Sequence, residues 1–262
     1  MSVTIKTARE IALMRESCAR LEKVFDHLAS MIRPGISTKT IDMEGERFIR
    51  SLGGVPNFLN YEGYPASICT SVNDEVVHGI PSHERILQEG DIISLDAGMI
   101  VDGYHSDAAR TYAVGEISQE ARDLMKVTRE SFFVGLAQAK AGNHINDISR
   151  AIGEYCESRG YGVVRDLVGH GIGRALHEDP QIPNFAQKMR GPKLVPGMTL
   201  AIEPMITTGT WEVEWLDDDW TVVTADGSLA AHYENTILIT EGEPEILTLT
   251  KGREAEEALY GV

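Results

Sequence analysis

The spacing of apolar residues predicts two helices at the start of the chain. Apolar side chains recur every three or four residues over 11–32, and Thr7 and Glu10 form a capping box just before them. Pro34-Gly35 stops this helix, and a second one is predicted over 37–52. Neither apolar face carries a polar cluster, so both helices are interpreted as scaffold.

The order of helices followed by strands returns about 110 residues later. Helices are predicted from 118 to about 141 and over 145–158, a strand over 198–207, and two strands around Asp226-Gly227. The chain between 174 and 195 is interpreted as loop. No residue-level repeat accompanies this order, which fits two similar halves facing each other. Since no proline- or serine-rich linker separates them, the sequence predicts one domain over 1–262.

The stretch 91–112 carries the first candidate chemistry. It is interpreted as a hairpin with Asp102-Gly103 at its turn, because this dipeptide accepts positive φ angles. Asp96 then lies opposite Ala109, and Asp107 is its diagonal neighbour on the same face, roughly 7–8 Å away. Two such carboxylates repel, and a bound cation removes that cost. The alternative at this point is two solvated acids on a polar hairpin face.

Further ionisable residues lie in apolar or glycine-rich sequence. Glu203 follows Leu-Ala-Ile, Glu234 precedes Asn-Thr-Ile-Leu-Ile, and His170 stands between glycines. Taken alone, each glutamate would be interpreted as the ion-pair partner of an arginine, and the histidine as a structural residue. Together with Asp96 and Asp107 they form an oxygen-rich set suited to two divalent ions bridged by carboxylates. Few arginines lie near these strands in sequence, which favours metal over ion pairs.

These residues and the strings around them resemble the type I methionine aminopeptidases. The strings are Gly63-Tyr-Pro-Ala-Ser-Ile-Cys69, Asn73-Asp-Glu-Val-Val-His-Gly-Ile-Pro81, Gly169-His-Gly-Ile-Gly173 and Glu203-Pro-Met205. The resemblance runs from the first helix to about Thr250. It implies an α+β pita-bread fold with two pseudo-symmetric halves, in which a curved antiparallel sheet is covered by helices.

The resemblance also implies a dinuclear site. Asp107 and Glu234 would bridge two divalent ions, Asp96 would complete one shell, and His170 and Glu203 the other. A hydroxide shared by the ions would attack the scissile carbonyl, with Glu203 as general base and then acid. The metal stays open among Co, Mn, Fe and Zn. Residue types do not decide whether backbone carbonyls near Val72 or Asn73 also hold a monovalent cation.

The substrate residues are likewise implied by the resemblance. His78 would lie near the reacting amide, and His177 would polarise the carbonyl or steady the oxyanion. The methionine pocket is expected from Phe58, Tyr61, Tyr64, Cys69, Leu176 and Trp220. Leu176 stands where many members carry phenylalanine, which should loosen the pocket edge without touching the chemistry. Read without the resemblance, these aromatic residues would be ordinary core or loop packing.

The expected function is removal of the initiator methionine from nascent proteins when the second residue is small, at the ribosome exit. One alternative is a proline-specific aminopeptidase or prolidase of the same fold. Those usually carry a large N-terminal domain, whereas about ninety residues precede Asp96 here. A second alternative is a non-catalytic binding module, which typically loses metal ligands, whereas all five are present.

Charge and cysteine content restrict the remaining options. A formal charge of −16 with scattered basic residues makes nucleic acid and anionic membranes poor partners. Cys18, Cys69 and Cys156 are odd in number and far apart, which argues against disulfides and a cysteine-rich zinc site. The start, Met1 to Lys6, lacks a secretion signal. The expectation is a cytoplasmic monomer of the short bacterial form.

Overall fold

The computed structural model describes residues 3–253, and both ends of the predicted domain, 1–2 and 254–262, lie outside the described residues. The helices are Ala8–Ala29 (α1), Thr38–Ser51 (α2), Gln119–Leu136 (α3) and Ile145–Glu157 (α4), with a 3₁₀ turn at Tyr61–Gly63 (η1). Thr7 accepts from the backbone N–H of Glu10, whose carboxylate accepts from the N–H of Thr7. The predicted capping box is thereby confirmed.

Within the described residues, a nine-stranded antiparallel sheet forms the centre of the molecule. Its main path is β1 (Val55–Pro56), β4 (Ile92–Val101), β5 (Tyr104–Ala113), β14 (Glu234–Leu238), β9 (Thr199–Ile202), β7 (Gly169–Gly171) and β8 (Glu178–Ile182); β2 (Ile68–Val72) pairs with β4, and β15 (Glu245–Ile246) with β14.

Two smaller antiparallel sheets lie beside the main one. The first contains β13 (Ala230–His232), β10 (Met205–Thr207) and β6 (Gly162–Val163), and the second contains β11 (Val213–Trp215), β12 (Val222–Thr224) and β3 (Glu75–Val77).

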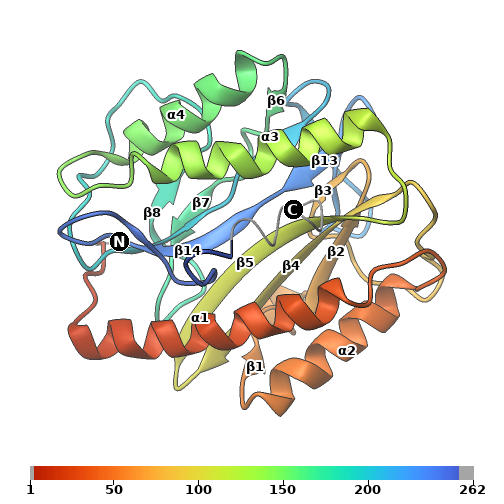
Figure 1. Ribbon diagram of the computed structural model, residues 1–262, viewed down its shortest axis with the longest axis horizontal. Coiled ribbons are helices and arrows are strands. Elements are labelled where there is room, and N and C mark those ends of the chain that lie inside the picture. Colours follow the sequence, from red (N-terminus) through yellow and green to blue (C-terminus); the bar gives the residue numbers. More distant parts are fainter. Residues whose placement is uncertain (1–2, 254–262) are drawn as a thin grey trace.

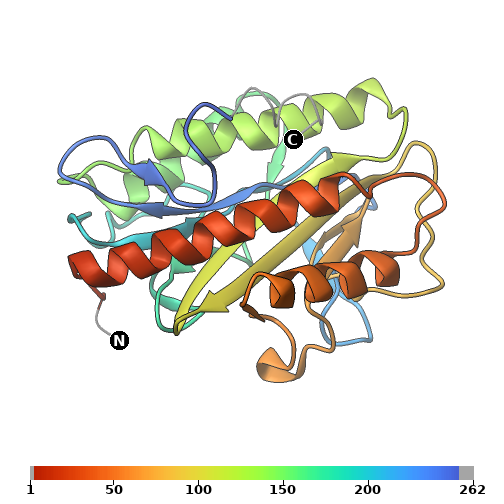
Figure 2. The ribbon, with the colours of Figure 1, turned by 60° about the horizontal axis from the view of Figure 1, so that its bottom comes forward.

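The helices divide between the two halves of the main sheet. Figure 1 shows α1 and α2 beside β4 and β5, and α3 and α4 on the other side of β14. Helix α1 packs on β5 and β4, and Figure 2 shows it lying across these strands. The predicted order of helix, helix and acid-bearing strands thus occurs twice in one α+β architecture. No helix in the described part of the chain is long and apolar enough to cross a membrane.

The hairpin of β4 and β5 has the predicted register. Asp102 and Gly103 form the turn with φ of 49° and 78°, as an Asp-Gly hairpin requires. Asp96 lies opposite Ala109 and Asp107 opposite Gly98, so the two acids are diagonal neighbours on one face. The local turn chemistry therefore determines that both carboxylates point the same way.

The prediction of one strand over 198–207 was wrong. The chain leaves the main sheet after β9 and joins a small sheet as β10, with Glu203 and Pro204 between them. Proline has no N–H to continue the ladder. A second break, at Tyr233 between β13 and β14, lies opposite the first, and the Tyr233 N–H donates to the Pro204 carbonyl at 3.2 Å. The paired breaks bring Glu203 and Glu234 to the same place.

Two further predictions were wrong for reasons of long-range pairing. The stretch predicted as loop contains β8, whose polar, proline-bearing sequence pairs with β7. Helix α3 ends at Leu136 rather than near Ala141. Its continuation leaves the helix because Gly142 donates its N–H to Leu194 and Leu194 donates to Asn143, at 2.9 and 2.7 Å.

Candidate active site and metal centre

A cavity of about 270 Å³ opens on the main sheet and is lined from both halves of the chain. The structure brings every site residue suggested by the sequence to this cavity: Phe58, Tyr61, Tyr64, Cys69, His78, Asp96, Asp107, His170, Leu176, His177, Glu203, Trp220 and Glu234. The lining also includes Glu62, Val77, Leu167, Val168 and Met205, which sequence reasoning missed. Their types are those of ordinary core and loop residues, so the sequence offered no signal for them.

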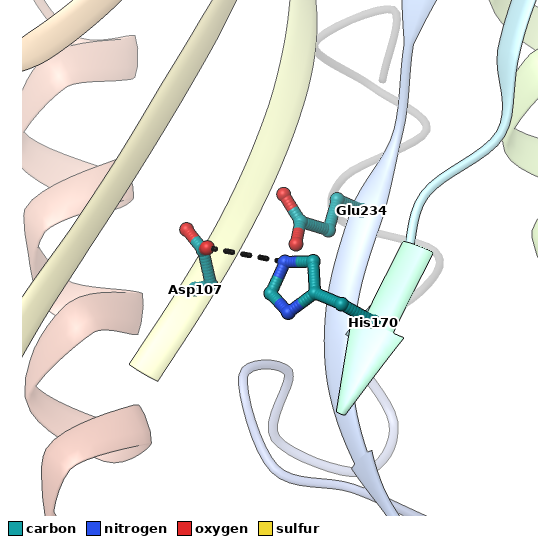
Figure 3. Close-up of side chains that lie close together, drawn as sticks. All are labelled: Asp107, His170 and Glu234. Atoms are coloured by element: carbon teal, nitrogen blue, oxygen red, sulfur yellow. Dashed lines mark ion pairs between the residues drawn. The ribbon is translucent and has the colours of Figure 1, made fainter. Parts of the chain in front are cut away.

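Three side chains from separate strands meet at the floor of the cavity. Asp107 from β5, His170 from β7 and Glu234 from β14 each present one ligand atom, and these atoms lie within 4.8 Å of one another (Figure 3). His170 Nε2 lies 3.9 Å from Asp107 Oδ2 and 3.6 Å from an oxygen of Glu203. Four potential ligands therefore converge, and Asp96 lines the same cavity.

The hydrogen bonding of His170 prepares its ring for a metal. Nδ1 lies 2.8 Å from the carbonyl of Gly171, which only accepts, so Nδ1 carries the hydrogen and Nε2 keeps a lone pair toward the acids. Burial lowers the pKa of His170 to about 3, so the ring is neutral at pH 7. Its contacts with Asp107 and Glu203 are therefore not salt bridges.

The two glycines beside His170 allow close strand packing. A Cβ at Gly169 would lie 2.4 Å from the Ala201 carbonyl oxygen, and one at Gly171 would lie 2.4 Å from that of Asp179. Only glycine fits at both positions, so β7 approaches β9 and β8 closely and holds the imidazole against the floor of the cavity.

The acids are costly to ionise where they stand. Burial raises the pKa of Asp96 to about 8. Burial, followed by repulsion from neighbouring acids, raises the pKa of Asp107, Glu203 and Glu234 well above the usual range. Each acid opposes ionisation of the others, so the cluster favours a partner of positive charge.

The carboxylates present oxygens that protein groups leave unpaired. Among residues 3–253, Asp96 Oδ1, Asp107 Oδ1 and Glu234 Oε1 are buried without a hydrogen-bond partner. The adjacent Arg110 donates to the backbone oxygens of Ala109 and Glu234 and to the side chain of Asn235. Unsatisfied buried oxygens together with one neutral imidazole suit divalent cations. These residues therefore suit the divalent metal ions that the sequence resemblance implied.

Aromatic rings form the apolar side of the cavity. Tyr64 donates its hydroxyl to the Gly79 carbonyl at 2.9 Å and meets Trp220 edge to face, with ring centroids 5.1 Å apart. Cys69 lies opposite Asp96 in the β2–β4 register, so the thiol borders the acids. Together with buried Phe58, these residues give a polarisable apolar wall next to the ligand cluster.

Two histidines line the cavity together with the ligand cluster. His78 has a positive φ of 59°, and burial lowers the pKa of its ring to about 4. His177 lies at the exposed rim, where partial desolvation still lowers its pKa. Its Nδ1 lies 2.7 Å from the Tyr61 hydroxyl, which fixes the ring's orientation. Both rings are therefore neutral at pH 7 and able to donate one hydrogen bond each.

His232 is a cavity neighbour that sequence reasoning missed. It is 1 % exposed, neither ring nitrogen has a hydrogen-bond partner within 3–253, and Nε2 lies 3.8 Å from Glu203 Oε2. Burial lowers its pKa to about 3. The same signal that identified Glu234, an ionisable residue in an apolar run, applies to His232 two positions earlier.

The metal-free protein should lose stability as the pH rises from about 5 to 8. The folded state holds protons on these acids in that range, because Asp96 has a pKa of about 8 and the others are raised, whereas unfolded acids titrate near pH 4. Each extra bound proton makes the free energy of unfolding fall by about 1.4 kcal/mol per pH unit. Urea unfolding with chelator at pH 5.5, 6.5 and 7.5 measures this slope. An equal slope in metal-loaded protein would contradict it.

Comparison with known proteins agrees with this geometry. Residues 12–241 match the model of the metallopeptidase family M24. A methionine aminopeptidase of Clostridium acetobutylicum is 56 % identical over 94 % of this chain and 99 % of its own. The structure of a methionine aminopeptidase from Thermotoga maritima has a TM-score of 0.92 at 44 % identity, covering 94 % of this chain and 99 % of that one.

A proline-specific enzyme is more distant. An Xaa-Pro dipeptidase from Bacillus anthracis reaches a TM-score of 0.77 at 28 % identity, and the match covers 94 % of this chain but 62 % of that one. The pita-bread fold predicted from the sequence is confirmed by these likenesses. The chain belongs to the metallopeptidase family M24 and, within it, to the type I methionine aminopeptidases.

Proposed function

We propose that this methionine aminopeptidase uses the described cavity to release the N-terminal methionine, and that it acts when the second residue is small. One observation carries the proposal: the acid and histidine cluster shares a cavity with an apolar, aromatic wall. A cleavable bond at the cluster would then place an apolar side chain against Tyr64, Cys69 and Trp220. The cavity volume of about 270 Å³ suits one such side chain and its backbone.

We assign the five ligands to two divalent ions. Asp107 and Glu234 would hold both ions, Asp96 one of them, and His170 with Glu203 the other. When bound, the ions would supply Lewis-acid catalysis and a lowered pKa for water at neutral pH. Co, Mn, Fe and Zn all accept this donor set. A monovalent cation at Val72 or Asn73 stays a prediction.

Side chains of the protein transfer protons and orient the substrate. Glu203 accepts the proton of the attacking water and gives it to the leaving amine, a role open to a carboxylate that bound cations keep ionised. His177 donates a hydrogen bond to the carbonyl oxygen from the rim, with Tyr61 holding its Nδ1. His78, which is less exposed than His177 and lines the same cavity, would lie near the reacting amide. The Tyr61 and His177 rings meet edge to face at the rim, where they would disfavour a bulky second residue.

The cellular setting is also part of the proposal. Protein N-termini are the substrates, and we place the reaction at newly made chains near the ribosome exit in the cytoplasm. The acidic charge of −16 makes a protein contact there more favourable than one with ribosomal RNA. Residues 1–262 are proposed to act as one catalytic domain and as a monomer.

Hydrolysis of three peptides tests the function. Chelated protein, restored with Mn, Co, Fe or Zn in turn, is assayed on Met-Ala-Ser, Met-Leu-Ser and Ala-Pro-Ala. We expect metal-dependent release of methionine from Met-Ala-Ser alone, with two ions bound per chain by elemental analysis. Turnover of Ala-Pro-Ala instead would identify a proline-specific enzyme. Inactivity on all three by folded, metal-loaded protein would favour the non-catalytic module.

A further inference from the structure

A buried ion pair joins the segment before α1 to the loop that carries two cavity residues. Lys6 Nζ lies 2.6 Å from Glu178 Oε2, although the residues are 172 positions apart in sequence. The side chains are 3 % and 13 % exposed. Removing both charges from water costs free energy that their attraction only partly returns, so such a pair is poor support for stability alone. Its position therefore calls for another explanation.

The second oxygen of Glu178 closes the loop that precedes it. Glu178 Oε1 accepts the backbone N–H of Arg174 at 2.9 Å and that of Ala175 at 3.3 Å. The loop, residues 173–178, contains Leu176 and His177, which both line the cavity. The Glu178 carboxylate thus links Lys6 to the loop backbone, and that backbone positions the side chains of Leu176 and His177.

Close packing leaves this loop little room to shift. A Cβ at Gly173 would lie 2.6 Å from Glu178 Oε1 and 2.6 Å from Lys6 Cε. The Gly173 carbonyl also accepts the N–H of His105 from β5 at 2.8 Å. The ion pair and the start of the loop therefore pack directly against each other.

The backbone of Lys6 is also held, by a segment other than the loop. Its backbone N–H donates to the Gly197 carbonyl at 2.8 Å, and Gly197 donates its own N–H to Ile239 at 2.9 Å. Gly197 lies two residues before β9, the strand that Glu203 follows directly. Lys6 therefore bridges the strand region that leads to Glu203 and the loop that carries His177.

We propose that Lys6 and Glu178 are positioning residues that set the substrate-facing wall of Leu176 and His177. The inference rests on the proposed function, which gives that wall its role. Neither Lys6 nor Glu178 lines the cavity, so loss of the pair should disturb substrate fit and leave metal binding unchanged.

Matched variants test the proposal in the metal-loaded full chain. Lys6→Met and Glu178→Gln remove one charge each, Lys6→Arg keeps it, and Arg15→Met breaks the exposed pair of Arg15 and Glu245 as a control. For each we measure kcat and KM on Met-Ala-Ser and Leu-Ala-Ser, bound metal and the unfolding midpoint. The ratio of kcat/KM on Met-Ala-Ser to kcat/KM on Leu-Ala-Ser reports on the wall of Leu176 and His177. A loss of stability alone would not change this ratio.

Lys6→Met is expected to lower kcat/KM on Met-Ala-Ser about tenfold and to narrow the preference for methionine over leucine, because a shift of about 1 Å in an aligned site is costly. Lys6→Arg should keep most of the kcat/KM and most of the methionine preference, and Arg15→Met should keep all of both quantities. Every variant should keep its bound metal.

The inference fails if Lys6→Met and Glu178→Gln stay within twofold of the unmodified protein in both kcat/KM and methionine preference. Should Lys6→Met not fold, Glu178→Gln decides by the same criterion, since its amide oxygen still accepts the loop N–H groups. An unmodified protein that releases no methionine would instead overturn the proposed function.

Discussion

Asp107→Asn is expected to abolish stabilisation by divalent metal while leaving the chelated protein at least as stable as before. Asp107 is a buried acid with raised pKa and an unpaired oxygen, so its replacement relieves repulsion when no ion is bound. With metal at 100 times its dissociation constant, the unmodified protein gains about 2.7 kcal/mol, and the variant should gain little of it. Activity should fall by at least about 100-fold.

Urea unfolding with and without metal measures this effect, and Asp42→Asn is the matched control. Asp42 is also buried, but it accepts the N–H groups of Ser67 and Ile68 outside the cavity. Its variant should lose stability equally with and without metal. Metal stabilisation that survives in Asp107→Asn would remove Asp107 from the ligand set.

Glu203→Gln is expected to lower kcat by about 10²–10⁴-fold with a smaller change in KM. The amide cannot take the proton of the attacking water, although it fills the same space between His170 and His232. Steady-state kinetics on Met-Ala-Ser, with bound metal measured in the same samples, separates this loss from loss of the ion.

Glu75→Gln is the control for Glu203→Gln. Burial raises the pKa of Glu75 as well, but its carboxylate accepts the Val72 N–H and does not line the cavity. We expect a kcat within about twofold of the unmodified protein, since no proton of the reaction passes through this site. A Glu203→Gln variant with full metal content and unchanged kcat would exclude Glu203 as the base.

Features that depend only on neighbouring residues could be predicted from the sequence. The capping box at Thr7, the Asp-Gly turn of β4 and β5, and the resulting face shared by Asp96 and Asp107 all follow from neighbouring residues. Acids in apolar runs were also detectable, because burying a charge without a partner is too costly to be accidental.

Contacts between distant segments were not predictable in this way. Strand β8 has a polar sequence and is a strand because β7 lies beside it. The break at Pro204 is understandable only with Tyr233 opposite, and the end of α3 depends on the Leu194 segment. His232 lies in the same apolar run as Glu234, but its 3.8 Å approach to Glu203, which lies 29 residues earlier in sequence, is visible only in the folded chain.

The place of β14 has a consequence for how this enzyme is itself made. This strand lies between β5 and β9 at the centre of the main sheet, yet about 120 residues separate it from β5 (Figure 1). While the chain is being synthesised, the facing edges of β5 and β9 stay unpaired until β14 has emerged. Glu234 arrives with that strand, so the ligand cluster is completed late. A protein proposed to act on newly made chains therefore cannot act until its own β14 has been synthesised and has paired.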